Sequence, residues 1–334
     1  PILFVSFTYF HLTKEGFSLE VFLWAILFYY LTGFSITAGY HRCFSHQSYQ
    51  ANAVVKLFFL IFGAASFQNS VLKWSRDHRY HHQFCDQEKD PYNIKKGFFY
   101  AHMGWIFYQE ENEDFRNVKD LERDPLIMWQ DRNIFLIGGA AGIILPIIIG
   151  FLIGFPLGGI GVIAFGRIVF VHHMTFFINS LCHMVGKVNF GKSHTAKDSA
   201  IMSLFTFGEG YHNFHHTFQS DYRNGVRWYH FDPTKWIIWT LSQIGFATKL
   251  KRVDEEIILL SRVKTKEDQL KDKLSLMPEE MLSHYKSLKS SFFNKMEAYK
   301  IRKNENLDYD IKIVIQAYKD LESFINKVPT LKLT

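Results

Sequence analysis

Nine of the sixteen histidines stand in four short groups, and they are the residues with the clearest chemistry. Neutral imidazole is the commonest metal ligand in proteins, so nine clustered rings are enough to hold two transition-metal ions. A nitrogen-rich set without a thiolate cluster suits iron, copper or zinc. The candidate ligands are His41, His46, His78, His81, His82, His183, His212, His215 and His216.

Two of the groups share the pattern His-x-x-His-His, at residues 78–82 and 212–216. Because residues three and four apart lie near one face of a helix, each group can present two ligands together and a third to the side. His172 and His173 fall within an apolar segment, so we expect supporting or packing roles for them. Four nearby carboxylates could orient the rings by accepting imidazole N–H groups: Asp86, Glu88, Asp90 and Glu209. For the first three, a solvated surface charge is the alternative.

Apolar segments flank the histidine groups and must position them. We expect four transmembrane helices, because a span needs about 20 mostly apolar residues. The chain begins at Pro1 inside an apolar stretch, so the first span is expected to have lost its N-terminal part. Residues 53–72 carry polar side chains and predict a buried or interfacial helix instead. The segments assigned to spans are 1–12, 17–39, 134–155 and 160–181.

An even number of spans would place both termini and all four histidine groups on one side of a bilayer. The loops at 40–133 and 182–334 hold nearly all Lys and Arg, an excess that is typical of cytoplasmic loops. Three cysteines without a C-x-x-C pair agree with a reducing compartment. The sequence therefore predicts a multi-pass membrane protein with its site on the cytoplasmic face. The membrane would be a bacterial inner membrane or, in a eukaryote, the endoplasmic reticulum.

Composition divides the chain into a membrane part, residues 1–248, and a charged, helix-prone extension, residues 249–334. The net charge of +6 comes without a recognisable nucleic-acid module. We therefore predict no nucleic-acid partner, and attribute the charge to the loop bias and to a phosphate-bearing substrate. A lipid chain beside the histidines favours iron over zinc, because an unactivated alkyl C–H bond requires oxygen activation and zinc has no redox chemistry.

Six motifs, in order along the chain, resemble those of the membrane acyl-CoA Δ9 desaturases of the stearoyl-CoA desaturase type. The resemblance covers roughly residues 17–235. The pair His172-His173 and the form Asn179-Ser-Leu-Cys-His183 look like the bacterial branch. The motifs are Thr37–His46, Trp74–His82, Asp90–Asn93, Gly97–Trp105, Asn179–His183 and Gly208–His216.

The resemblance implies an all-α integral membrane protein in which four transmembrane helices carry a cytosolic helical cap with a diiron site. The nine histidines would ligate two Fe ions, and Asn179 would contribute through a bound water. The implied reaction inserts a cis double bond at carbon 9 of a saturated acyl chain, with O2 as co-substrate and two electrons. Because the tail carries no cytochrome b5 haem motif, the electron donor would be a separate protein such as a ferredoxin or cytochrome b5.

The resemblance also implies substrate contacts. Matched positions place Gln68, Trp74 and Thr175 at the bend of an acyl tunnel. Tyr29 and Gly33 match its far end, where side-chain bulk would set chain length, and Asn69, Arg76 and Asp77 match contacts to the CoA head group. Animal enzymes carry a basic pair where this chain has Gln109-Glu110. A carrier-protein thioester or a phospholipid acyl chain therefore stays open beside acyl-CoA, although Lys95 and Lys96 could compensate.

Two other functions use similar ligands. A membrane diiron hydroxylase or alkane monooxygenase would return oxygen to the carbon instead of removing a second hydrogen. The spacing from His41 to His46 and the Glu209–His216 stretch favour the desaturase. A metal-storing or metal-transporting protein is the non-enzymatic alternative. Transporter ligands lie near the bilayer midplane, whereas these histidines fall at span ends and in loops.

Overall fold

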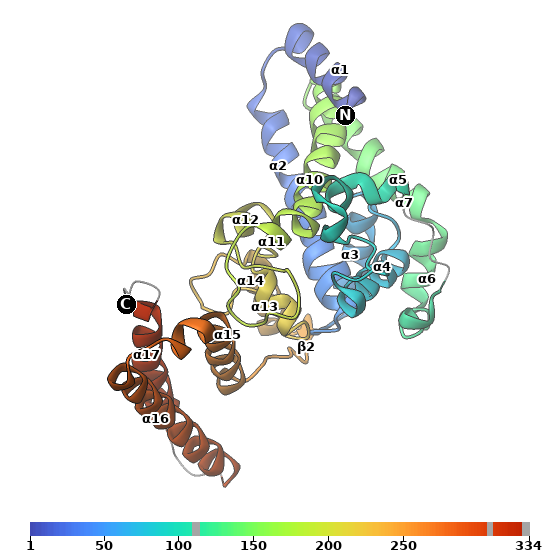
Figure 1. Cartoon of the computed structure of the whole chain (residues 1–334). Coiled ribbons are helices and arrows are strands. Elements are labelled where there is room, and N and C mark those ends of the chain that lie inside the picture. Colours follow the sequence, from blue (N-terminus) through green and yellow to red (C-terminus); the bar gives the residue numbers. More distant parts are fainter. Residues whose placement is uncertain (109–113, 306–309, 329–334) are drawn as a thin grey trace. The chain divides into compact units, whose positions relative to one another are not determined.

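The computed structural model describes residues 1–108, 114–305 and 310–328, and these are mostly helical (Figure 1). They form two compact units. The first joins Pro1–Lys187 to Ser193–Arg252, and the second joins Val188–Lys192 to Val253–Thr334. A short antiparallel pair of strands, β1 (Gln50–Ala51) and β2 (Ala247–Thr248), joins the segment after the first long helix to the end of the first unit.

Three helices among the described residues are long and apolar enough to cross a membrane: Leu19–Ser45, Ile134–Leu152 and Pro156–Met184. They rise 1.5 Å per residue, so the shortest, with 19 residues, spans about 28 Å, close to a hydrocarbon core of about 30 Å. These three long helices contain α2 (Leu19–Phe34), α7 (Ile134–Gly139), α8 (Leu145–Leu152), α9 (Pro156–Gly158), α10 (Arg167–Asn179) and α11 (Leu181–Met184).

Three of the four predicted spans lie in these long helices, and the first one, residues 1–12, stays a prediction. That apolar segment forms α1 (Ile2–Phe10) and then five residues of π-helix, before Gly16 turns the chain with a positive φ of 81°. The segment after the first long helix forms the short apolar helix α3 (Ala53–Ala64), as expected of a helix that does not span.

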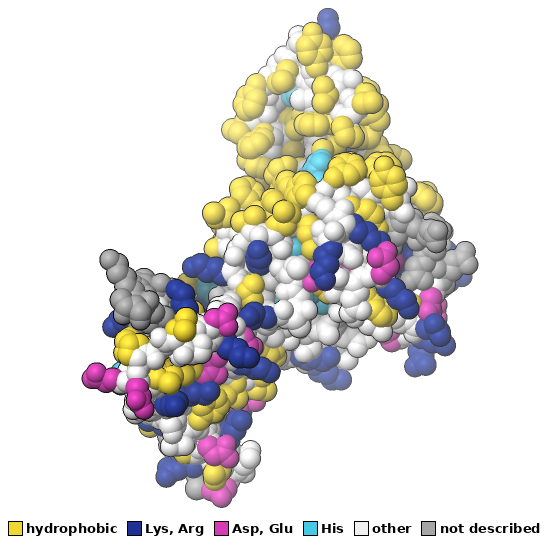
Figure 2. All heavy atoms as spheres, in the orientation of Figure 1, with side chains coloured by type: hydrophobic (Ala, Val, Ile, Leu, Met, Phe, Trp, Pro, Cys, Tyr) yellow, Lys and Arg dark blue, Asp and Glu magenta, His cyan; other side chains and the backbone are white. Residues whose placement is uncertain are grey.

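The long helices pack closely through small residues. A Cβ added at Gly150 in α8 would lie 2.7 Å from the Cα of Gly159, which immediately follows α9. Backbone this close requires glycine on both sides, a pattern common between membrane helices. Large apolar side chains point outward, among them Phe22, Phe135 and Leu152. Figure 2 shows hydrophobic side chains gathered over these long helices of the first unit, a surface suited to lipid.

The polar part of the first unit carries the histidines on short helices that join the ends of the long ones. Its core packs Tyr40, Leu60, Val71 and Ile238 together, all buried. The helices of this part are α4 (Val71–Phe84), α5 (Trp105–Tyr108), α6 (Pro125–Arg132), α11 (Leu181–Met184), α12 (Ala200–Phe205), α13 (His212–Thr217) and α14 (Pro233–Gln243).

The second unit contains α15 (Glu255–Ser275), α16 (Glu279–Asn304) and α17 (Ile311–Lys327) around a core that includes Phe292 and Tyr318. The described residues 253–305 and 310–328 hold none of the metal-ligand groups described below. The charged helical extension predicted for residues 249–334 overlaps this unit, which also includes Val188–Lys192.

Candidate metal centre

The first histidine pair depends on an unusual helical turn. The first long helix continues beyond α2 as a π-helix over Ser35–Ser45. The backbone N–H of His46 donates to the carbonyl of His41 at 3.0 Å, a bond five residues long that brings the two rings to 4.8 Å between centroids. π-Helical turns occur most often at functional sites. The spacing of five residues therefore places both imidazoles at one point.

Five histidines form the first ligand group. The ligand nitrogens of His41, His46, His78, His82 and His215 all lie within 4.8 Å of one another. The Nε2 atoms of His41 and His82 are each 3.0 Å from that of His215. The Nε2 atoms of His46 and His78 lie 2.8 Å apart.

The remaining four histidines form a second group. His81, His183 and His216 have ligand atoms within 4.8 Å of one another. The Nε2 atom of His212 lies 3.1 Å from those of both His183 and His216.

Each His-x-x-His-His motif divides between the two groups. In α4 the outer pair, His78 and His82, joins the first group and His81 joins the second. In α13 the outer pair joins the second group and His215 joins the first. In each helix two histidines therefore reach one group and the third reaches the other, in agreement with the prediction of two ligands on one face and a third to the side. The outer pair belongs to the first group in α4 and to the second group in α13.

Hydrogen-bond acceptors behind the rings set their orientation. His41 Nδ1 lies 3.0 Å from a carboxylate oxygen of Glu209, and His81 Nδ1 lies 2.8 Å from Asp90 Oδ1. His183 Nδ1 donates to Thr195 Oγ1 at 2.8 Å, and that hydroxyl donates to Asp86 at 2.7 Å. With a proton held on Nδ1, each of these rings turns the lone pair of Nε2 toward the group.

Of the four carboxylates predicted to orient the rings, three lie behind histidines and one lies on the surface. Asp90 and Glu209 contact ring nitrogens directly, and Asp86 acts through Thr195, a residue that the sequence analysis missed. Glu88 instead pairs with Lys96 at 2.8 Å on the surface, the alternative allowed for it above.

A buried ion-pair network fixes Glu209. Arg42 donates to Glu209 at 2.8 Å and to Asp232 at 3.0 Å, with all three side chains buried. Burial by itself would raise the pKa of Glu209, but Arg42 and His41 outweigh it and lower this pKa. Arg42 belongs to a recognised motif, whereas nothing local to Asp232 signals its role, since it lies 190 residues away.

The donor set fits metal ions. Bare Nε2 lone pairs facing one another at about 3 Å repel, and a shared cation removes that repulsion. Burial lowers the pKa of His78, His82 and His215 well below the usual value, and neighbouring histidines lower it further. These rings are therefore neutral, which is the form that binds metal. Two adjacent groups of five and four nitrogens suit two transition-metal ions.

Two further side chains border the second group. Cys85 Sγ lies with the ligand atoms of His81, His183 and His216. Burial raises the pKa of this thiol, and Asp86 and Asp90 raise it further, so it stays protonated and is a weak ligand. The ring of His194 lies 5.0 Å from that of His216, outside the two groups. The sequence offered no signal for either residue beyond proximity to a motif.

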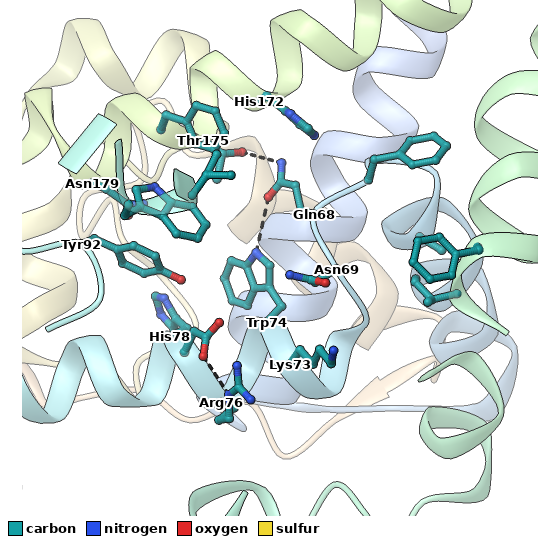
Figure 3. Close-up of a pocket in the computed structure, with 18 residues that line it drawn as sticks. Gln68, Asn69, Lys73, Trp74, Arg76, His78, Tyr92, His172, Thr175 and Asn179 are labelled. Carbon is teal, nitrogen blue, oxygen red and sulfur yellow. Dashed lines mark hydrogen bonds and ion pairs between the residues drawn. The ribbon is translucent and has the colours of Figure 1, made fainter. Parts of the chain in front are cut away.

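A cavity of about 410 Å³ opens beside the first group (Figure 3). Gln68 Nε2 donates to Thr175 Oγ1 at 2.9 Å, and Trp74 Nε1 donates to Gln68 Oε1 at 3.4 Å. His78 forms part of the wall, so the cavity reaches the candidate metal ligands. Besides His78, seven residues predicted for substrate or metal line it: Gln68, Asn69, Trp74, Arg76, Asp77, Thr175 and Asn179.

The other two predicted substrate residues, Tyr29 and Gly33, line a separate, much smaller cavity. Asn179 ends α10 in the wall of the large cavity, and its role through a water stays a prediction. Lys73 also lines the large cavity, one helical turn before Asp77, and was not singled out from the sequence. Gln109-Glu110 lie outside the described residues.

His172 and His173 contact groups other than the two ligand sets. His172 Nε2 donates to the carbonyl of Ser66 at 2.7 Å, and His173 Nδ1 lies 3.0 Å from His102 Nε2. Both contacts are of the supporting kind expected for this pair.

A sequence model of the fatty acid desaturase family matches residues 19–244. The chain belongs to the fatty acid desaturase family. It is 45% identical over 239 residues to a probable acyl-CoA desaturase of Schizosaccharomyces pombe, covering 70% of this chain and 50% of that protein. It is 36% identical over 233 residues to an sn-1 stearoyl-lipid 9-desaturase of Synechocystis, covering 68% and 70%.

Human stearoyl-CoA desaturase is 33% identical over 249 residues, covering 72% of this chain and 69% of that protein. The prediction of a fatty acid desaturase is confirmed at the level of this family. Similar relatives come from yeasts, mammals and a cyanobacterium, so the predicted bacterial branch is not singled out. The chain spans about half the length of the two yeast relatives.

Proposed function

We propose that this chain is a fatty acyl desaturase that inserts a cis double bond at carbon 9 of a saturated acyl chain, using O2 and two electrons. One observation carries the proposal: two adjacent histidine groups meet a cavity through His78, and Thr175 lines both this cavity and a smaller one bordered by the long apolar helices. A lipid chain in these cavities would lie against the metal ligands.

Two iron ions, bound by the five and the four histidines, would supply the oxygen activation that alkyl C–H cleavage requires. The protein's own part is positioning. Glu209, Asp90 and Thr195 hold the ring protons on Nδ1 of the histidines that they contact. The bonded row of Trp74, Gln68 and Thr175 gives the cavity a polar turn at which the acyl chain bends.

Apolar rings keep the reacting part of the cavity dry. Phe67, Trp105 and Phe176 line it together with the polar row. Excluding water strengthens electrostatic interactions in the site and prevents side reactions. Asn179, in the same wall, is proposed to hold a water beside the metal.

The head group is proposed to be an acyl-CoA thioester. Lys73 and Arg76 bring two cationic side chains to the cavity, and several similar proteins are named acyl-CoA desaturases. A membrane-lipid acyl chain is the second candidate, since the Synechocystis relative is named for a stearoyl-lipid substrate. Binding on the cytoplasmic face and electrons from a separate protein such as a ferredoxin or cytochrome b5 complete the proposal.

The test expresses the full-length protein in a host that lacks unsaturated fatty acids and maps any double bond by mass spectrometry. We expect a cis double bond at carbon 9 and two irons per purified chain. His82→Ala should abolish the product, whereas His284→Ala, a matched change in α16, should leave it intact. A product that gains oxygen would instead indicate a hydroxylase, and a metal-loaded protein without O2 consumption would refute both.

A further inference from the structure

Thr175 lines both the small cavity and the large one, so the two cavities are neighbours at this side chain. The small cavity lies between α2 and α10, within two of the membrane-spanning helices. Its volume is about 20 Å³, room for little more than one water-sized group.

The ring of Phe207 forms part of the wall of the small cavity. Phe207 comes from the loop after α12 and is only 6% exposed. Its ring centroid lies 4.9 Å from those of both Tyr29 and Phe34, and 5.5 Å from that of Tyr30. A Cβ added at Gly33 would lie 2.3 Å from Phe207 Cε2. The space that Gly33 leaves on α2 is therefore filled by Phe207.

The loop holds this ring firmly. Phe207 has a positive φ of 56°, a conformation that a bulky residue keeps only where its surroundings determine it. Its carbonyl accepts from Thr234 Oγ1 at 2.8 Å, and Thr37 donates to the same hydroxyl at 2.8 Å. The carbonyl of Phe205 accepts from Tyr29 at 2.6 Å. Contacts from α2, the π-helical end of that helix and α14 thus fix the loop.

The same loop leads directly to the metal centre. Glu209, which contacts His41, follows Phe207 by two residues. The distance between the ring of Phe207 and the histidines is therefore set by a short, buried piece of backbone. A stop held this way can define how much acyl chain lies beyond the reacting carbons.

We propose that Phe207 closes the far end of the acyl tunnel and sets the longest chain that the protein accepts. The inference rests on the proposed desaturase function. It assigns the limit on chain length to Phe207 instead of Gly33, because a larger side chain at residue 33 would act by displacing the Phe207 ring. One methylene more or less in an apolar pocket changes selectivity by about 10–200-fold. Removing six ring carbons should therefore be easily measured.

The test compares wild type, Phe207→Ala, Phe207→Leu and Phe205→Ala in a host supplied with saturated acids of graded length. Phe205 is the matched control because its side chain is 47% exposed and lines neither described cavity. We expect both Phe207 variants to raise the ratio of long to short unsaturated products at least about tenfold, with the double bond unmoved. Phe205→Ala should keep the wild-type ratio.

A second readout does not depend on catalysis. Saturated acyl chains of increasing length should stabilise the purified wild-type protein only up to a limit, measured as the shift in melting temperature, and Phe207→Leu should extend that limit. Unchanged product ratios and an unchanged binding limit in the Phe207 variants would overturn the inference. A wild type that binds acyl chains without forming unsaturated product would refute the desaturase function while leaving the binding limit to decide the role of Phe207.

Discussion

Asp90 offers the sharpest test of how the second histidine group is held. Its Oδ1 accepts from His81 Nδ1 at 2.8 Å and from the backbone N–H of Tyr92 at 2.9 Å. Its Oδ2 accepts from the N–H of Asp86 at 2.9 Å. Asp90→Asn keeps the shape but supplies one oxygen and one NH2 group. In either orientation of the amide, its NH2 group would therefore face at least one of these three N–H groups, which would be left without an acceptor.

The magnitude follows from that mismatch. One buried donor without an acceptor costs about 1–3 kcal/mol of folding free energy. Loss of the partner behind a metal-binding histidine weakens metal affinity by about 10–100-fold, which is about 1.4–2.8 kcal/mol. We expect the loss to fall on the second group alone, because the first group does not contain His81.

The assay follows the metal content of purified protein in competition with a graded chelator. Asp90→Asn should lose one of two metals at a chelator concentration about tenfold or more below that for wild type. Glu88→Gln is the matched control, since Glu88 stands two residues away on the same loop but pairs with Lys96 at the surface. Equal metal retention in wild type and both variants would refute the role assigned to Asp90.

Three further predictions concern residues outside the two histidine groups. Gly150→Ala should destabilise the detergent-solubilised protein by about 1–3 kcal/mol because its Cβ meets backbone, whereas Gly139→Ala, which meets nothing within 4 Å, should not; equal melting temperatures would contradict this. Partial burial would raise the pKa of Asp120, but its hydrogen bonds from Arg79 outweigh burial and lower this pKa. The ion pair therefore stabilises the fold fully at a pH above the ordinary carboxyl pKa. This stabilisation is lost as the pH falls through the lowered pKa of Asp120. Asp120→Asn should therefore cost up to about 1 kcal/mol at neutral pH and nothing in strong acid, and a pH-independent difference would argue otherwise. Phe292→Ala should cost the second unit about 3–5 kcal/mol, seen as faster proteolysis within α16 at unchanged metal content, and a simultaneous loss of metal would contradict it.

Much of the fold and site was predictable from local sequence. The three long apolar helices after residue 17 and the short apolar helix at residues 53–64 follow from hydropathy and length. The first predicted span, residues 1–12, stays a prediction, because only a continuous helix of sufficient length can cross a bilayer.

The candidate histidine ligands were predictable from the sequence, because residues three and four apart lie near one helix face. The family followed from the same motifs. The tertiary structure alone decided how the nine rings divide, since that depends on how α4 and α13 face each other. It also brought Asp232 to Arg42, Thr195 to His183, and Phe207 into the space left by Gly33. These partners are distant in the chain and belong to no local repeat, so only three-dimensional packing could bring them together.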